Sequence, residues 1–524
     1  MQRSHSVLFV VLIFATTVAN AQNPLGIFEN HQDVGTVLHP GSATFDPSKA
    51  TYTLRGSGEN MWSTQDAFQF AWKKVSGDVE LTANVSFPNS TGNPHKKAGL
   101  IFRTSLNVDS VYADIALHGN GLLALQYRDQ NGGTTHEIKS SLSPADANAA
   151  APSSPLPPIQ LKLVRRGEYL YMFVGKPGET PHYDGESIRV PLQGDFYVGI
   201  GVCAHDKNDT QEALFSNVQL RNISASNGSP VLVSTLETVA ANSTDRQVVY
   251  YAAGRFEAPN WTRDGSYFLF NRNGHLERLS VKGGTPEVIN TGAQNRLNND
   301  HGISPDGTQL AISDNSQETK SPDGKPAHDS LVYTVPITGG APRQITKTGP
   351  SYWHGWSPDG KTLAFVGQRN GDFDIYTIPV SGGDETRLTT SKGLDDGSEY
   401  SRDGQYIYFN SERSGHMQIW RMKSDGSDQE QVFSDDYNNW FPHISPDGKW
   451  MVFLTYQRDV TGHPENKNVM LRLMNLEDKK ITELAKLFGG QGTINVPSWS
   501  PDSKTVAFVS YALLAPEDAH GDTK

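Results

Sequence analysis

Three histidines stand shortly before repeated turns in the second half of the chain. His301 and His354 precede their turns by three residues, His443 precedes its turn by two, and Gln491 follows later in the chain. Neutral imidazole with carboxylate and amide oxygens is a ligand set for divalent metals. We therefore expect a candidate cation (Mn, Zn, Fe or Ca) at these four residues, where it could support metal-dependent sugar chemistry.

Other polar and aromatic residues occupy similar places before the turns: Asn260, Asn299, Asp300, Trp353, Asp395, Asp396, Glu399, Asn439, Trp440 and Asn495. They could line a ligand-binding rim without chemistry, or they could hydrate a water-filled channel and join neighbouring units by hydrogen bonds. Successive residues of a strand point to opposite faces. The different offset of His443 from its turn therefore predicts that His443 diverges from His301 and His354.

The turns belong to a phrase that recurs six times. The copies are Thr262-Arg263-Asp264-Gly265, Ser304-Pro305-Asp306-Gly307, Ser357-Pro358-Asp359-Gly360, Ser401-Arg402-Asp403-Gly404, Ser445-Pro446-Asp447-Gly448 and Ser500-Pro501-Asp502-Ser503. Most intervals match the period of a four-stranded propeller blade, and two longer ones hold insertions. Runs with period-two alternation follow the phrases, as in residues 362–366 and 374–380, and turn residues separate these runs. The pattern predicts antiparallel hairpins.

The phrase resembles the repeat of TolB-type propellers, which also occurs in dipeptidyl-peptidase IV-like and prolyl oligopeptidase-like proteins. The resemblance covers about half of the chain and implies a six-bladed β-propeller over residues 231–524. Too little chain follows Ser503 to complete the last blade. Residues 230–251 contain two apolar runs that could supply the missing outer strands and seal the ring.

The first half of the mature chain lacks the phrase but contains long alternating strands, which predict two sheets packed face to face. Residues 97–103 and 215–218 resemble concanavalin-like or laminin-G-like jelly rolls, which implies a carbohydrate-binding sandwich over residues 22–222. Residues 223–230, with Asn227-Gly228-Ser229, are the expected interdomain linker. The fold class is therefore all-β, a sandwich followed by a propeller.

Residues 1–21 have the features of a bacterial-type secretory signal. Arg3 precedes an apolar run over residues 7–18, and Ala19-Asn20-Ala21 forms a cleavage pattern. Because the only cysteine, Cys203, lies far from this site, a lipid anchor is not expected, and no later segment is apolar enough to span a membrane. We expect a periplasmic or secreted protein.

Composition excludes several functions. The chain has 524 residues and a net charge of −12 without long basic runs, which argues against nucleic-acid binding. A serine peptidase would need an α/β-hydrolase domain with its Gly-x-Ser-x-Gly elbow, and the residues after the last strand leave no room for one. One cysteine cannot form an intramolecular disulfide.

Two functions of different class remain open. One is an exported binding protein whose propeller face engages an envelope protein or a glycan, as the resemblance to TolB implies. The other is a metal-dependent carbohydrate-active enzyme similar to the oligogalacturonate lyases, which are propellers that hold a divalent cation through His and Gln. The sandwich predicted for the N-terminal half departs from the smaller mixed domain of TolB, which puts membership of the Tol-Pal system in doubt.

Overall fold

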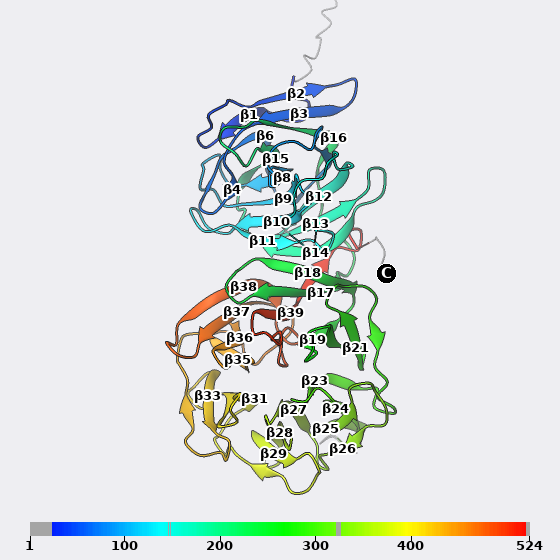
Figure 1. The fold of residues 1–524 in the computed structure, drawn as a ribbon, viewed down its shortest axis with the longest axis vertical. Coiled ribbons are helices and arrows are strands. Elements are labelled where there is room, and N and C mark those ends of the chain that lie inside the picture. The colour runs from blue at the N-terminus through cyan, green and yellow to red at the C-terminus, as the bar shows by residue number, and fades with distance from the viewer. Residues whose placement is uncertain (1–23, 145, 147, 321–325, 520–524) are drawn as a thin grey trace, which may run out of the picture.

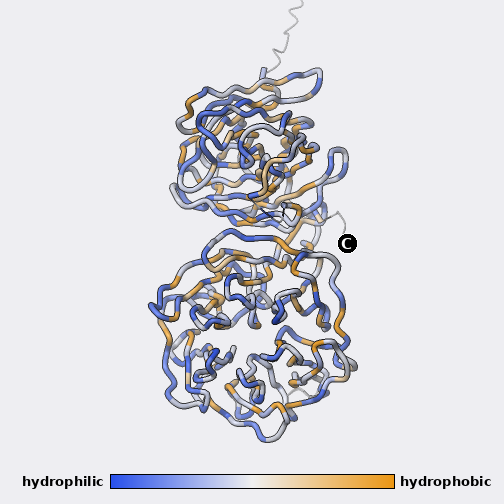
Figure 2. The backbone as a smooth tube through the Cα atoms, in the orientation of Figure 1, coloured by the Kyte–Doolittle hydropathy of each residue, from blue (hydrophilic) through white to orange (hydrophobic). Residues whose placement is uncertain are grey.

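The computed structural model describes residues 24–144, 146, 148–320 and 326–519, all of them in strands and connecting turns. The predicted signal, residues 1–21, lies outside the described residues. An N-terminal domain packs on a ring of small sheets (Figure 1). Hydrophobic and hydrophilic residues are interspersed along the chain in both parts (Figure 2). Within the described residues, no helix is long and apolar enough to cross a membrane.

The N-terminal half forms most of one large sheet, which three strands from the other half of the structure extend, and all of a second. The first has the order β1 (Asn30–Val34), β6 (Phe68–Ser76), β15 (Asp195–Cys203), β8 (Lys97–Arg103), β9 (Tyr112–His118), β10 (Leu123–Arg128), β11 (His136–Lys139), β18 (Arg246–Ala253), β17 (Val231–Ala240) and β39 (Thr505–Leu514). The second has the order β14 (His182–Arg189), β13 (Tyr169–Gly175), β12 (Ile159–Arg166), β7 (Val79–Ser86), β16 (Gln211–Asn222), β3 (Thr51–Gly56) and β2 (Ser42–Asp46). A short hairpin, β4 (Met61–Trp62) with β5 (Gln65–Asp66), stands apart.

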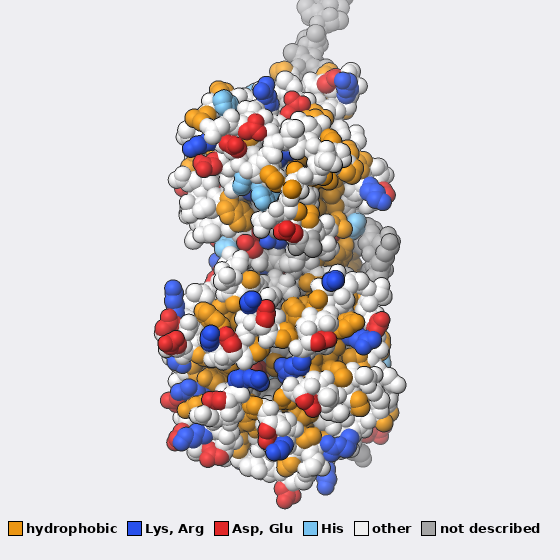
Figure 3. Space-filling model, viewed as in Figure 1, with side chains coloured by type: hydrophobic (Ala, Val, Ile, Leu, Met, Phe, Trp, Pro, Cys, Tyr) orange, Lys and Arg blue, Asp and Glu red, His pale blue; other side chains and the backbone are white. Residues whose placement is uncertain are grey.

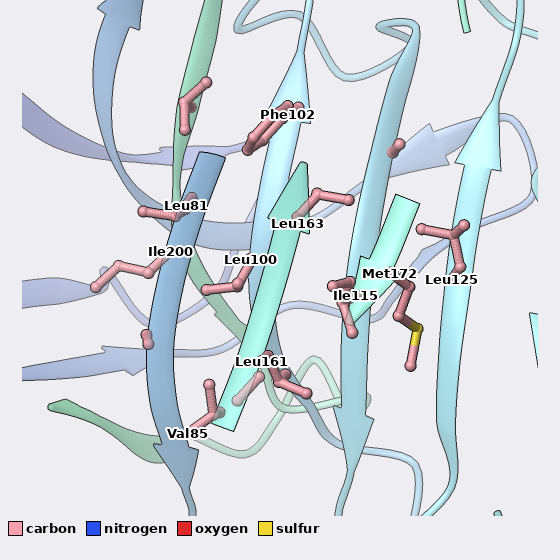
Figure 4. Packing of buried hydrophobic residues seen from close by; sticks show 14 of the residues in the cluster. Leu81, Val85, Leu100, Phe102, Ile115, Leu125, Leu161, Leu163, Met172 and Ile200 are labelled. Atoms are coloured by element: carbon pink, nitrogen blue, oxygen red, sulfur yellow. The ribbon is translucent and has the colours of Figure 1, made fainter. Parts of the chain in front are cut away.

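The largest hydrophobic core lies between these two sheets. Leu100 and Ile115 from the first sheet meet Leu81, Leu163 and Met172 from the second (Figure 4). All five side chains are fully buried. This is the face-to-face packing that the alternating strands predict, because each strand turns every second side chain toward the opposite sheet.

The second half forms five four-stranded antiparallel sheets around a common centre (Figure 1). Within each sheet the strands are named from the centre outward. The first two sheets contain β19 (Phe256–Trp261), β20 (Tyr267–Arg272), β21 (His275–Ser280) and β22 (Glu287–Val288), and then β23 (Leu297–Ile303), β24 (Gln309–Lys320), β25 (Pro326–Pro336) and β26 (Arg343–Gln344). The other three contain β27 (Ser351–Trp356), β28 (Thr362–Gln368), β29 (Phe373–Pro379) and β30 (Thr386–Arg387); β31 (Asp395–Tyr400), β32 (Tyr406–Ser411), β33 (Gln418–Lys423) and β34 (Glu430–Gln431); and β35 (Asn438–Ile444), β36 (Trp450–Tyr456), β37 (Lys467–Asn475) and β38 (Ile481–Gly489). This is a β-propeller.

The repeated phrase joins the innermost strand of each sheet to the second strand. In the third copy, Ser357 Oγ donates to Asp359 Oδ1 over 2.6 Å and accepts from the backbone of Thr362 over 2.9 Å. Gly360 has a φ of +69°, which glycine adopts without steric cost. The sixth copy places Ser503 at this position with a φ of +63°. Each residue type in the phrase therefore has a role in closing the turn.

The six turns contact one another in a closed ring. A Cβ placed on Gly307 would lie 3.3 Å from Arg263 in the preceding turn, and one on Gly265 would lie 3.8 Å from Pro501 in the last turn. Corresponding contacts join the third turn to the second, the fourth to the third and the fifth to the fourth. A hydrogen bond from the backbone of Asp447 to Ser503 Oγ, over 2.9 Å, joins the fifth turn to the last. The first and last copies of the phrase are thus neighbours in space.

The ring is closed by pairing between its two ends, as the sequence predicts. Strand β17 pairs antiparallel with β39 over ten residues, from Val231–Leu514 to Ala240–Thr505. Five separate four-stranded sheets are present where six were expected, because β39, β17 and β18 belong to the ten-stranded sheet. A parallel pair between β18 and β11 continues that sheet into the N-terminal domain.

A buried ion pair fastens the closing strands together. Arg246 on β18 donates from Nε and Nη2 to the two carboxylate oxygens of Glu237 on β17, over 2.7 and 2.6 Å. Ser510 on β39 also donates to Glu237. The charged side chains are 2% and 0% exposed, so neither could be solvated if it lost its partner.

We expect Glu237→Gln to lower the free energy of unfolding by about 3–5 kcal/mol, because the change leaves the charge of Arg246 buried without its counter-ion. Denaturant unfolding followed by tryptophan fluorescence measures the loss. The matched control is Glu287→Gln, which breaks the exposed cross-strand pair of Arg278 and Glu287 at 2.8 Å and should cost less than about 1 kcal/mol. Equal effects of the two changes would show that the buried pair does not hold the closure.

Candidate functional site: the axial cavity

The innermost strands each carry an irregularity in the middle. The pairing register shifts between Glu257 and Asn260, between Leu297 and His301, and at the corresponding places in the other three sheets. Ala258, Gly397 and Phe441 have positive φ values at these places. Such bulges turn the side chains that follow away from the regular alternation. They therefore decide which residues face the propeller axis.

One cavity of about 370 Å³ opens along the axis at the end where the innermost strands begin. Amides, carboxylates, imidazoles and aromatic rings line it: Asn298, Asn299, Asp300, Asn315, Tyr352, His354, Phe373, Asp396, Phe441, His463, Gln491 and Asn495, together with Val366 and Leu394. Of the residues predicted for the rim or for a metal, His354, Asn299, Asp300, Asp396, Gln491 and Asn495 are therefore brought together.

Asp396 joins two histidines from different sheets. Its Oδ1 lies 3.0 Å from His354 Nε2, and its Oδ2 lies 3.8 Å from His463 Nε2. Burial lowers the pKa of His354, but Asp396 outweighs burial and holds this pKa above its ordinary value. Burial conversely raises the pKa of Asp396, and His354 outweighs that effect, so the carboxyl remains ionised with a pKa below its ordinary value.

The other side of His463 is held by an amide chain. Its Nδ1 is hydrogen-bonded to Gln491 Oε1, which also accepts from Asn495 Nδ2 over 3.1 Å. Asn495 Oδ1 in turn accepts from the backbone of Gly492 over 2.7 Å. These hydrogen bonds connect His463 to the backbone of Gly492, so the cavity wall on this side is fixed in position.

Asp300 is a buried carboxyl on the wall of the cavity. Burial raises its pKa to about 7, with His354 opposing the shift and Asp396 and Glu257 adding to it. Near neutral pH the carboxyl can therefore both donate and accept hydrogen bonds. A carboxyl held in this way inside a cavity is typical of a binding or catalytic site.

Two of the predicted metal ligands lie outside the cavity. His443 is hydrogen-bonded through Nδ1 to Glu399 Oε2, over 2.6 Å, and through Nε2 to the carbonyl of Ile494. His443 is therefore absent from the cavity lining that contains His354. His301, whose offset equals that of His354, is also absent from the cavity lining, and burial lowers its pKa to about 4. The bulges explain this difference, because His354 is the unpaired residue of its bulge whereas His301 pairs with Ile312.

The other predicted rim residues have structural roles or lie at the opposite end of the axis. Asp395 forms an ion pair with Arg413 at 2.9 Å, and Asn439 accepts from Thr455 over 2.9 Å. Trp440 is buried in a hydrophobic cluster. Asn260, Trp353 and Glu399 line a separate, smaller cavity beside the repeated turns. The four predicted metal ligands therefore do not meet at one point.

His463 and Phe441 are cavity residues that the sequence analysis missed. His463 lies in the polar insertion between β36 and β37 and reaches the axis from there, with its ring 4.5 Å from that of Trp440. Within the described residues, no group of three or more His, Cys, Asp or Glu side chains has an arrangement that could hold a metal ion. The cavity offers hydrogen-bonding groups and ring faces for an organic ligand.

Comparison with known proteins identifies the propeller. The model of the TolB β-propeller domain matches residues 326–510. An uncharacterized protein from Agrobacterium fabrum is 47% identical over 279 residues, which cover 53% of this chain and 92% of that protein. The chain belongs to the TolB β-propeller family. A solved structure of a TolB candidate from Agrobacterium tumefaciens is 47% identical, covers 54% of this chain and 99% of its own, and has a TM-score of 0.50. TolB from Acinetobacter baumannii is 17% identical over 59% of this chain and 69% of its own, with a TM-score of 0.35.

The axial carboxyl of this TolB-type propeller should make stability depend on pH. Because the pKa of Asp300 is raised on folding, its contribution to stability is greatest below pH 3.8 and is lost as the pH rises through about 7. We expect Asp300→Asn to stabilise the protein relative to wild type by about 2 kcal/mol at pH 8 and by much less at pH 4.

Chemical denaturation of both proteins between pH 4 and pH 8 measures this difference. The control is Asp384→Asn, a change to an exposed aspartate between β29 and β30 of the same propeller, which should not reproduce the gain of Asp300→Asn at high pH. A gain from Asp300→Asn that does not grow with pH would contradict the raised pKa.

Proposed function

We propose that this TolB-type protein is an exported binding protein whose axial cavity holds a sugar unit of a glycan. The observation that carries the proposal is the meeting of carboxylates, amides and aromatic rings in one cavity. Carboxylate and amide groups bind pairs of hydroxyls, and ring faces pack against the C–H faces of sugars. The volume of about 370 Å³ is in the range of small-molecule sites, roughly 300–1,000 Å³.

The charges of the cavity support a polyhydroxylated ligand. Asp396 is neutralised by His354 at 3.0 Å, and Asp300 is held near its point of half-ionisation. The cavity therefore has no large unbalanced charge that would demand an ion as its occupant. It offers both donors and acceptors, and hydroxyl groups, which also do both, match such a lining.

The proposed architecture includes a sixth blade. Strand β39 follows the sixth phrase, and β17 and β18, which precede the first phrase, pair beside it. A bridge between Trp499 and Val506 supplies the innermost segment. The closed ring of six turns supports this assignment. The N-terminal part is proposed to be a concanavalin-like jelly roll that contacts a longer stretch of the same glycan, and residues 1–21 are proposed to direct export to the periplasm or beyond.

The metal-dependent lyase is the second candidate. Of its four predicted ligands, His354 and Gln491 line the cavity, whereas His301 and His443 do not. A divalent cation at this site would need other partners, of which Asp396 and His463 are the nearest. We rank this function below glycan binding, and the same experiment tests both.

A glycan array with neutral and uronate oligosaccharides, followed by isothermal titration calorimetry of the best ligand, tests the proposal. We expect Asp300→Asn to weaken binding at least tenfold, because a charge-assisted hydrogen bond is lost, and Tyr352→Ala to weaken it through loss of ring contact. Asp384→Asn, in the exposed loop between the outer strands β29 and β30 and away from the cavity, should bind like wild type.

Three outcomes are informative. Loss of binding in both cavity variants but not in the control supports the proposal. Binding that is unchanged by either variant would place the ligand elsewhere on the protein. Binding that disappears after treatment with a chelator and returns with Mn, Zn, Fe or Ca would favour the metal-dependent function, and cleavage of a uronate oligosaccharide would establish it.

A further inference from the structure

The second position of the repeated phrase carries a feature that glycan binding does not explain. Four of the six copies have proline there, and the first and fourth have Arg263 and Arg402. Five of these six residues line one cavity of about 120 Å³ at the turn end of the propeller axis: Arg263, Pro305, Pro358, Arg402 and Pro446. In a ring of six turns, the first and fourth copies stand on opposite sides of the axis.

In the part of the chain that the structure describes, neither arginine forms an ion pair with a carboxylate. Arg263 donates from Nη2 to the carbonyl of Ile303 and from Nε to that of Ser304, over 2.9 and 3.2 Å, which positions the guanidinium without neutralising it. Among the described residues, Arg402 has no hydrogen bond or ion pair and is exposed. Arg263 and Arg402 line the same cavity. Burial lowers the pKa of Arg263, Glu399 opposes this shift, and Arg402 adds a smaller lowering.

The one carboxylate in this cavity is already occupied. Glu399 accepts from the backbone of Ile444 through Oε1, over 3.0 Å, and is hydrogen-bonded to His443 through Oε2, over 2.6 Å. Both oxygens therefore have partners within the propeller. The chain as a whole carries a net charge of −12, and these two arginines without an ion pair stand in one cavity lining.

Aromatic rings surround the two arginines. Trp356 donates from Nε1 to the carbonyl of Gly302, and Trp499 donates to that of His443, over 3.1 and 3.0 Å. With their N–H groups satisfied, these side chains present apolar rings to the cavity, as does Trp261. On the face shown in Figure 3, Lys and Arg side chains stand beside the centre of the propeller, among hydrophobic surface. Tryptophan and arginine together are typical of the centre of protein interfaces.

We propose that the turn end of the propeller axis binds an acidic segment of a partner protein, with one carboxylate between Arg263 and Arg402 and an apolar neighbour against the tryptophans. A cavity of about 120 Å³ admits a single side chain and no more. Guanidinium groups bind carboxylates with directed hydrogen bonds, and the apolar rim lowers the local dielectric constant and strengthens them. This site lies at the opposite end of the axis from the glycan cavity and does not depend on it.

The sequence itself provides the test variant. Arg402→Pro gives the fourth phrase the residue that four other copies have at this position, so the turn should fold as they do. The backbone N–H of Arg402 makes no hydrogen bond in the described structure, so proline removes none. Arg402→Lys keeps the charge, and Arg458→Ala, which removes an exposed arginine paired with Asp436 at 3.2 Å, is the control.

The probe is a fluorescein-labelled peptide of six glutamates with one tryptophan, and its binding to the full-length protein is measured by fluorescence anisotropy. We expect Arg402→Pro to weaken binding about tenfold or more, Arg402→Lys to weaken it by less than about threefold, and Arg458→Ala to have no effect. Binding should also fall when NaCl is raised to about 500 mM, because exposed charges are screened. Unchanged thermal unfolding of Arg402→Pro shows that the turn has folded.

Equal peptide binding by wild type and Arg402→Pro would overturn the proposal. If Arg402→Pro unfolds at lower temperature, Arg402→Gln replaces it, and equal binding by that variant has the same meaning. Binding of trigalacturonate or inorganic phosphate with the same dependence on Arg402, but no binding of the peptide, would also overturn it by assigning the site to a small anion. Neither outcome would bear on glycan binding in the axial cavity.

Discussion

The propeller depends on the pairing of β17 with β39. These strands are more than 260 residues apart in sequence, yet they pair over ten residues and bring the first and last phrases together. The closure removes the open edge that a chain of hairpins would otherwise present. Because β18 also pairs with β11, the same strands attach the N-terminal domain to the ring. The buried pair of Glu237 and Arg246 lies within this joint and fixes its register.

Closure in turn determines what meets at the axis. The innermost strands surround the axis and carry their bulges at the same level along it. Each bulge turns toward the axis side chains that regular alternation would direct toward a neighbouring sheet. Polar residues such as Asp300 and Asp396 therefore line one end of the axis, whereas the turns place Arg263 and Arg402 at the other. Between these two ends of the axis, the strands of the sheets pack their apolar side chains against one another and so keep the two cavities separate.

Much of the fold could be predicted from the sequence, because the turn phrase has a local cause. Its serine, aspartate and glycine each have a role in the same hydrogen-bonded turn, so its six copies indicate a repeated structural unit. The short stretch of chain after the last copy indicates that strands from elsewhere must close the ring. The site was harder to predict because alternation fails at bulges, and nothing in the offsets of His301 and His354 distinguishes them. His463 comes from an insertion outside the repeat, so that only tertiary structure brings it to Asp396.

The two ends of the axis differ in a way that bears on function. A carboxyl such as Asp300 costs stability when it ionises inside a cavity, and a proline at position 402 would close the turn without leaving an arginine exposed and unpaired. Neither residue is explained by folding alone. Both lie where no strand pairing or core packing requires them, and both face a cavity. The residues that folding does not require are therefore the ones that indicate ligand binding. They are carboxyl and amide side chains at one end of the axis and arginines at the other.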